Sequence, residues 1–167
     1  KLQVKQVMEL GEWLGFETRN KYKILDDAGM LVAYAAEQQK GIFGFILRQY
    51  LGHWRKFDVN FYTPTQELFM VGHHPFRWIF QRIEIKDPLG GHLGAIQTRF
   101  SILTKRFDVE DENGAVIMEM SSAMWKMWTF PFMHMGRKVA EIQKKWSGLL
   151  SEAMTDRDNF TVEFIDP

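Results

Sequence analysis

The chain repeats one local pattern along most of its length: an alternation of apolar and polar residues, a cluster of turn-forming residues, and a second alternation. The turn clusters contain Asp, Asn, Gly or Pro, which are the residues that close tight turns between antiparallel strands. Such strand–turn–strand units cover residues 22–34, 57–70, 83–96, 107–120 and 130–142. The pattern predicts consecutive antiparallel hairpins.

The number of hairpins constrains the architecture. With flanking strands they give roughly ten to twelve strands, and a sheet of that size tends to close because closure removes exposed edges. We therefore expect a mainly β fold, a closed antiparallel barrel of about 12 strands, as a single domain over residues 1–167. Such a barrel is too wide for its own side chains to fill, so we expect something to occupy its lumen. Helical spacing predicts short helices over Leu2–Leu14 and Gly41–Trp54.

Composition excludes several classes of function. The chain has no Cys, which rules out disulfides, thiol catalysis, cysteine-ligated zinc and S-palmitoylation. Lys plus Arg and Asp plus Glu number 21 each, so the chain has no overall attraction to nucleic acid or to anionic lipid, and any such attraction must come from local patches. We find no catalytic triad or acid–base pair, and we expect a protein that is not an enzyme.

The sequence shows neither a membrane-spanning segment nor a signal peptide. No run approaches the ~18–20 apolar residues that span a bilayer, and the polar first residues do not form a signal peptide. We expect a cytoplasmic protein that can lie at the membrane periphery. Because the sequence begins at Lys1 rather than Met, we also expect it to be trimmed at both ends.

Three segments, residues 43–50, 76–82 and 124–132, place aromatic side chains beside Lys or Arg. This combination suits the headgroup region of a bilayer, with rings at the acyl boundary and cations on phosphate. Packed strand or helix faces with cations extending to solvent are the more common interpretation, and both stay open. The candidate membrane contacts are Phe43, Trp78, Trp125 and Trp128.

Two charged clusters near the C-terminus are candidate ligand sites. Asp156, Asp158 and Asn159 supply oxygen ligands for weak calcium binding, although such residues more often form a turn by bonding their own backbone. A basic cluster suits phosphate headgroups, or simply a solvated strand edge, and favours nucleic acid less. It comprises Arg137, Lys138, Lys144 and Lys145.

Three stretches resemble, in order, landmarks of the phospholipid scramblase family. The first is the Gly-Phe-Glu-Thr-x-Asn-x-Tyr element that begins at Gly15, and the second is Gln81–Ile85. The third runs from Lys144 to Phe160 and contains the acidic cluster. The resemblance implies a fold similar to the Tubby C-terminal domain, a barrel of about twelve strands around a buried apolar C-terminal helix. That helix is expected after Pro167.

The resemblance also implies an activity, which is calcium-stimulated, energy-independent movement of phospholipids between leaflets. It extends the candidate calcium segment to Asp166 and implies a phospholipid membrane surface as partner, with a protein partner as a further option. The chain lacks the cysteines that carry palmitate in the family, and in this respect it resembles a bacterial member more than an animal one. The alternative function is a Tubby-like module that binds lipid headgroups or a protein without transport.

Overall fold

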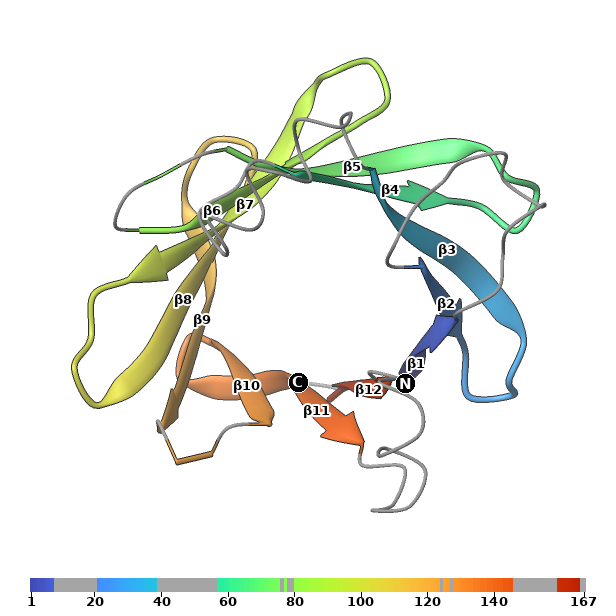
Figure 1. Ribbon diagram of the computed structural model, residues 1–167. Coiled ribbons are helices and arrows are strands. Elements are labelled where there is room, and N and C mark those ends of the chain that lie inside the picture. Colours follow the sequence, from blue (N-terminus) through green and yellow to red (C-terminus); the bar gives the residue numbers. More distant parts are fainter. Residues whose placement is uncertain are drawn as a thin grey trace, which may run out of the picture.

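The structure is a computed structural model that describes residues 1–7, 21–38, 57–75, 77, 80–123, 125–126, 128–145 and 159–165. Within these ranges the chain forms strands that close into one barrel, seen along its axis in Figure 1. The first half of the barrel consists of β1 (Leu2–Val7), β2 (Lys21–Leu25), β3 (Leu31–Gln38), β4 (Phe57–Tyr62), β5 (Leu68–His74) and β6 (Arg82–Lys86). The second half consists of β7 (His92–Arg99), β8 (Thr104–Glu110), β9 (Val116–Ala123), β10 (Thr129–His134), β11 (Arg137–Lys145) and β12 (Asn159–Phe164).

Every strand pairs antiparallel with its neighbours in sequence, and β12 pairs with β1 to close the ring. At this closure Leu2 lies opposite Val162 and Lys5 lies opposite Asn159. The hairpins predicted from the sequence all form, as β2–β3, β4–β5, β6–β7, β8–β9 and β10–β11. The predicted closed antiparallel barrel of about 12 strands is therefore confirmed.

Three of the hairpins close with the same chemistry, an Asp-x-x-Gly turn. The aspartates Asp26, Asp87 and Asp111 each accept a hydrogen bond, at 2.8, 2.8 and 2.9 Å, from the backbone N–H four residues later. The glycine of each turn has a positive φ of 80°, 92° or 82°, a conformation that costs glycine little. These short-range contacts explain why the sequence pattern located the hairpins correctly.

The predicted helix over Leu2–Leu14 is wrong for Leu2–Val7, which form β1. The apolar spacing fits a helix, but Leu2 and Val4 also alternate with Gln3 and Lys5 in the period of a strand. The backbone of this strand bonds to β2 on one side and β12 on the other, and such tertiary pairing outweighs local helix preference. Residues 8–14 and the predicted helix Gly41–Trp54 lie outside the described residues.

The strand register gives the barrel wall two faces of different chemistry, because directly opposed residues on neighbouring strands share a face. On one face Ile83, Ile96 and Val109 form a continuous apolar row across β6, β7 and β8. On the other face Arg82 of β6 lies opposite Gln97 of β7. The wall therefore pairs an apolar face with a polar one.

The most buried apolar cluster lies where β3 meets β4. Tyr34, Ala36 and Tyr62 form it, and Leu31 and Leu68 pack against it. No large side chain among the described residues is fully buried, as expected for a wall one sheet thick. The occupant of the lumen stays a prediction. The described part of the chain also contains no helix with the length and apolar character needed to cross a bilayer.

Candidate functional site

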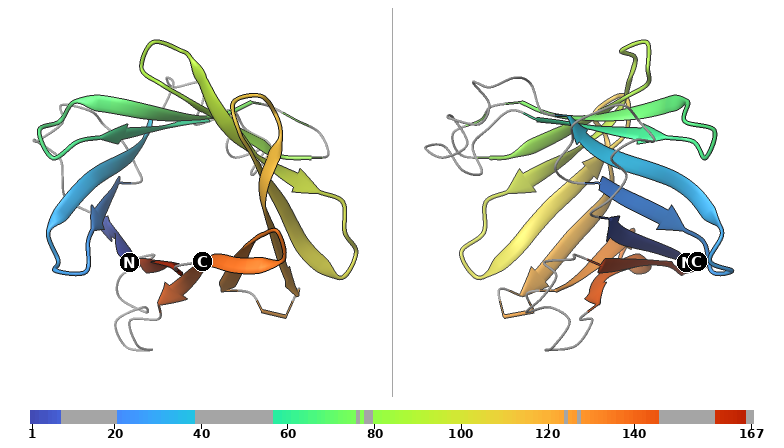
Figure 2. Two further views of the ribbon diagram at one scale, coloured as in Figure 1. Left: turned by 180° about the vertical axis from the view of Figure 1, so that it is seen from behind. Right: turned by 45° about the vertical axis from the view of Figure 1, so that its right-hand side comes forward.

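The alternating strand directions sort the connections of the barrel into two ends. The hairpin turns after β2, β4, β6, β8 and β10 lie at one end together with both termini, which we call the terminal end. The described residues of the connections after β5, β7 and β9 lie at the other end, which we call the loop end. In the right-hand view of Figure 2 the termini lie on one side, and the β7–β8 and β9–β10 connections lie toward the other.

The β7–β8 connection exposes three large apolar side chains within four residues. Phe100, Ile102 and Leu103 are 72%, 78% and 71% exposed. The hydroxyls of Ser101 and Thr104 are 2.5 Å apart, and the Thr104 N–H donates to Ser101 Oγ at 3.2 Å. The one polar residue of the loop therefore bonds inward, while its apolar neighbours extend into solvent.

The β9–β10 connection adds Trp125, Lys126 and Trp128. Trp125 is 78% exposed, whereas Trp128 packs under Lys144, whose Nζ lies 4.4 Å from the centre of the ring. This is the geometry of a cation–π contact. The Lys144 N–H also donates to the Trp128 carbonyl at 2.9 Å, so β11 holds the second tryptophan in place.

The two connections lie side by side because the strands that carry them are paired up to their ends. Thr104, the first residue of β8, is directly opposite Ala123, the last residue of β9. Three exposed side chains of one loop and one of the other therefore belong to one surface. This surface, which we call the apolar tip, comprises Phe100, Ile102, Leu103 and Trp125.

Basic residues surround the apolar tip. The described residues of the loop-end connections include the cations Arg77 and Lys126 and no Asp or Glu. The three nearest residues of each adjoining strand add Arg82, Arg99, Lys105 and Arg106, together with one acid, Glu84. The turns of the terminal end contain the acids Asp26, Asp27, Glu67, Asp87, Asp111 and Glu112 and no Lys or Arg. Among the described connections, the net neutral chain thus separates its charge between the two ends of the barrel.

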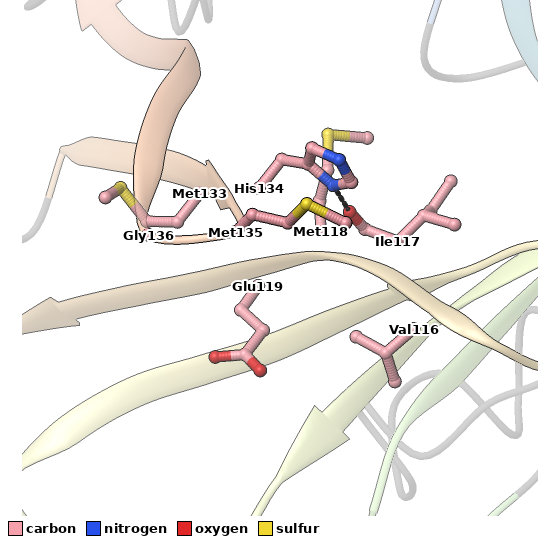
Figure 3. A pocket seen from close by; sticks show the side chains of 8 residues that line it. All are labelled: Val116, Ile117, Met118, Glu119, Met133, His134, Met135 and Gly136. Atoms are coloured by element: carbon pink, nitrogen blue, oxygen red, sulfur yellow. Dashed lines mark hydrogen bonds between the residues drawn. The ribbon is translucent and has the colours of Figure 1, made fainter.

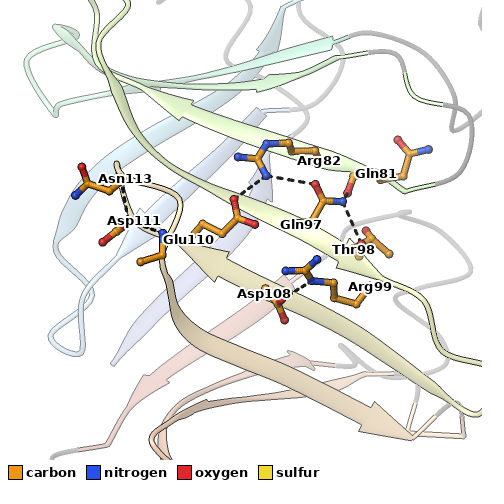
Figure 4. A network of polar contacts seen from close by, with 10 residues as sticks. Gln81, Arg82, Gln97, Thr98, Arg99, Asp108, Glu110, Asp111 and Asn113 are labelled. Atoms are coloured by element: carbon orange, nitrogen blue, oxygen red, sulfur yellow. Dashed lines mark hydrogen bonds and ion pairs between the residues drawn. The ribbon is translucent and has the colours of Figure 1, made fainter.

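A polar network fixes the strands beneath the tip (Figure 4). Arg82 on β6 bonds Glu110 on β8 at 2.7 Å and Gln97 on β7 at 3.3 Å. Closer to the tip, Arg99 forms an ion pair with Asp108, and the hydrogen bond in this pair raises the pKa of Arg99. These contacts link three successive strands and hold the base of the β7–β8 connection.

The structure places two of the four predicted membrane contacts, and both lie at the loop end. These are Trp125, whose ring is open to solvent, and Trp128, whose ring lies under the ammonium group of Lys144. Phe43 and Trp78 lie outside the described residues. The exposure of Trp125 shows that this side chain is not packed in the core, and its membrane contact stays a prediction.

The predicted basic cluster is divided between the two ends of the barrel. Arg137 and Lys138 begin β11 at the terminal end, and Lys144 and Lys145 end it, with about 23 Å of strand between Arg137 and Lys144. Lys138 is ion-paired with Glu141 at 2.6 Å, and this hydrogen bond lowers the pKa of Glu141. The structure therefore does not bring the four cations together.

The predicted calcium ligands are only partly described. Asn159 begins β12, where it lies opposite Lys145 and Lys5, whereas Asp156, Asp158 and Asp166 lie outside the described residues. Ile165, the last described residue, lies about 20 Å from Asn159 at the far end of the strand. Within the described ranges, no three His, Asp or Glu side chains are grouped in a way that could hold a metal ion.

A groove of about 380 Å³ lies at the terminal end, where β9 and β10 diverge (Figure 3). The two strands pair at Met120 and Glu119, and beyond that point His134 Nδ1 lies 2.5 Å from the Ile117 carbonyl oxygen. The groove is lined by Val116, Ile117, Met118, Glu119, Met133, His134, Met135 and Gly136. This lining has no Lys or Arg, so it does not suit a lipid phosphate.

Comparison with known proteins connects this barrel to one family. A family model described as Scramblase matches residues 1–166. The chain belongs to the scramblase family. No solved structure matches it, so the likeness to the Tubby C-terminal domain stays a prediction.

Curated relatives of this scramblase family member include proteins from animals and yeast. Phospholipid scramblase 1 of Homo sapiens is 30% identical over 96% of the chain and 54% of its own length. Phospholipid scramblase 2 of Bos taurus is 28% identical over 98% of the chain and 59% of its own length. A phospholipid scramblase family protein of Schizosaccharomyces pombe is 21% identical over 96% of the chain and 44% of its own length. The chain thus spans about half the length of these relatives.

Sequence reasoning missed the β7–β8 part of the apolar tip. It did not single out Phe100, Ile102 and Leu103, which lie between the predicted strand–turn–strand units 83–96 and 107–120. The signal was nevertheless present, since this connection, like the described residues of the β9–β10 connection, contains no Asp, Asn, Gly or Pro. A tight connection built from large apolar residues is unusual and indicates a contact surface.

Proposed function

We propose that this scramblase family member binds phospholipid bilayers and promotes movement of phospholipids between the leaflets. Family membership and the names of the relatives support the proposal. The structural observation that carries it is the exposed Trp125 beside Lys126, at an end of the barrel whose described connections contain cations and no acids. The chain spans about half the length of each relative, so we base the proposed activity on this surface as well as on family membership.

The chemistry of the loop end matches that of a bilayer interface. Tryptophan rings favour the headgroup boundary, where one edge is apolar and the other is wet. Lys and Arg near an anionic leaflet each contribute about 1 kcal/mol of attraction. A protein held in this way lies at the membrane as a peripheral protein, and the cytoplasmic side is its proposed location.

Lipid movement down a gradient requires no covalent step. The barrier is the cost of carrying a polar headgroup through hydrocarbon, so the protein must lower that cost rather than activate a nucleophile. This role needs no acid–base pair, in agreement with a protein that is not an enzyme. A headgroup-binding module without transport is not favoured by the comparisons, since the relatives described above are named as scramblases.

We include calcium as a weakly bound regulator. Asp156 and Asp158 directly precede Asn159, and the three side chains offer oxygen ligands of the kind calcium prefers. Asn159 begins a strand at the loop end, so an ion bound there would add positive charge on the side proposed to face lipid. Asp166 follows Ile165 at the other end of that strand and would belong to a separate ligand set.

Vesicle co-sedimentation tests the proposal. We expect the chain to pellet with vesicles of phosphatidylcholine and phosphatidylserine, more strongly with millimolar calcium, and less with phosphatidylcholine alone. At ~1 M salt the Debye length falls to about 3 Å, so the electrostatic part of binding should weaken while apolar insertion remains. A chain that pellets with neither vesicle, with or without calcium, would contradict lipid binding.

A further inference from the structure

We propose that the barrel docks end-on on the bilayer, inserting the apolar tip of Phe100, Ile102, Leu103 and Trp125 into the headgroup region. The terminal end then faces away from the membrane. This inference rests on the proposed function and adds to it the docking surface, its main residues and the orientation of the barrel. The occupant to which we commit is a phospholipid bilayer that contains anionic lipid.

The first argument is the density of exposed apolar side chains. Connections between strands are usually polar, because they run through solvent. Here the β7–β8 connection and its neighbour present four large apolar groups on one surface, each more than two-thirds exposed. A group of this size marks a contact surface, whereas single exposed apolar residues do not.

The second argument is the charge around the tip. Arg99 lies directly opposite Arg106 at its base, and like charges in directly opposed positions destabilise a sheet. Asp108 pairs with Arg99, but Arg106 forms no ion pair within the described residues. A lipid phosphate beside these guanidinium groups would offset the repulsion while the apolar side chains enter the acyl boundary.

The third argument excludes the opposite end of the barrel. The terminal end also exposes apolar residues, but Met30, Leu89 and Met135 lie in three separate turns. Asp26 and Asp27 share a turn with Met30, and Asp87 shares one with Leu89. An anionic surface would repel these carboxylates, so the terminal end suits solvent.

The fourth argument is that the tip is already ordered. The Ser101–Thr104 contacts fix the loop, and the Arg99–Asp108 pair and the network around Arg82 fix the strands below it. A surface that is held in its docking conformation loses little conformational freedom on binding. Insertion therefore needs no rearrangement of the described loops.

A site-specific fluorophore distinguishes the two ends. The chain has no Cys, so Ile102→Cys and Leu89→Cys each create one labelling site, and both positions are well exposed, at 78% and 96%. With an NBD label and vesicles of phosphatidylcholine and phosphatidylserine, we expect a blue shift and a several-fold rise in intensity at position 102. At position 89 we expect neither change.

Paired substitutions provide the second measurement. We expect Ile102→Asp with Leu103→Asp to reduce vesicle partitioning on the order of tenfold or more, because two carboxylates cannot enter an anionic interface. The matched control, Leu89→Asp with Met135→Asp, changes two residues of comparable exposure at the other end and should keep partitioning within about twofold. Circular dichroism and the thermal midpoint check that both variants fold as the parent does.

Each outcome has one meaning. Vesicle binding with the fluorescence change at position 89, or with equal changes at both positions, overturns the end-on orientation and leaves the proposed function intact. Equal partitioning of the two double variants also overturns it. If the tip substitutions alter only the oligomeric state in size-exclusion chromatography, the tip is an interface between copies. If the parent chain binds no vesicles, the proposed function and the docking surface both fail.

Discussion

At the scale of single residues, the barrel wall holds carboxylates in their ionised form with lysines on the same strand. Lys86 Nζ lies 3.1 Å from Glu84 Oε2, and this hydrogen bond is the largest influence on the pKa of Glu84, which falls below its usual value of 4.5. Burial opposes the effect, but the nearby cations outweigh it. Lys138 acts in the same way on Glu141.

This pairing predicts a pH dependence of stability. A carboxyl whose pKa is lowered by folding stabilises the native state above its unfolded pKa, and the contribution disappears as the pH falls through the folded pKa. Replacing Lys86 with Met should therefore lower the free energy of unfolding at pH 7 by about 1 kcal/mol or less, as for other half-exposed pairs. The difference from the parent should shrink between pH 7 and pH 3, as the pH falls through the lowered pKa of Glu84.

Urea unfolding at the two pH values measures the effect. The matched control is Lys23→Met, which removes the same charge from a lysine that forms no ion pair with an acid among the described residues. The free energy of unfolding of Lys23→Met should differ from that of the parent by the same amount at both pH values. A Lys86→Met deficit that stays constant or grows on acidification would contradict the assignment.

At the scale of elements, the β4–β5 turn departs from the Asp-x-x-Gly design that three other hairpin turns share. Thr63 takes the place of Asp in the β4–β5 turn, where its Oγ1 accepts the Glu67 N–H at 3.1 Å. Gln66 takes the place of Gly, with φ at 69°. A side chain in this left-handed conformation costs roughly 1 kcal/mol, so the turn carries strain that its three counterparts avoid.

Gln66→Gly should therefore stabilise the protein, by up to roughly 0.5 kcal/mol after the greater flexibility of glycine in the unfolded chain is counted. The reverse change, Gly114→Gln, should destabilise by a similar amount, because a side chain at this position meets no atoms within 4 Å and its cost is that of the backbone alone. Thermal unfolding of both variants checks the pair. The two substitutions should change the stability in opposite directions. A destabilising Gln66→Gly would contradict the assignment of strain to this turn.

Elements also show how far the sequence alone could predict the molecule. The hairpins were predictable because turn chemistry acts within four or five residues, as Asp26 and Gly29 illustrate. The strand Leu2–Val7 was not, because its partners are β2 and a strand near the other end of the chain. The apolar tip was hidden for the same reason, since only the pairing of β8 with β9 brings the connections that carry Leu103 and Trp125 next to each other.

At the scale of the whole molecule, closure of the barrel gives the chain two chemically distinct ends. Composition alone describes a neutral protein, but among the described connections the alternating strand direction places acidic turns at one end and basic, aromatic connections at the other. The Arg137–Lys145 strand shows the same effect, because it divides a cluster that is compact in sequence. The polarity of the barrel, rather than its net charge, is the property that suits a membrane surface.

The most direct test of the account is a lipid-flip measurement on the reconstituted protein. Vesicles with NBD-labelled phospholipid are treated with dithionite, which bleaches the outer leaflet only. We predict that the chain with millimolar calcium makes nearly all of the label accessible, and that Asp156→Asn with Asp158→Asn removes the calcium dependence. Bleaching that stops at the outer-leaflet share, in vesicles to which the protein is bound, would contradict scramblase activity in this chain.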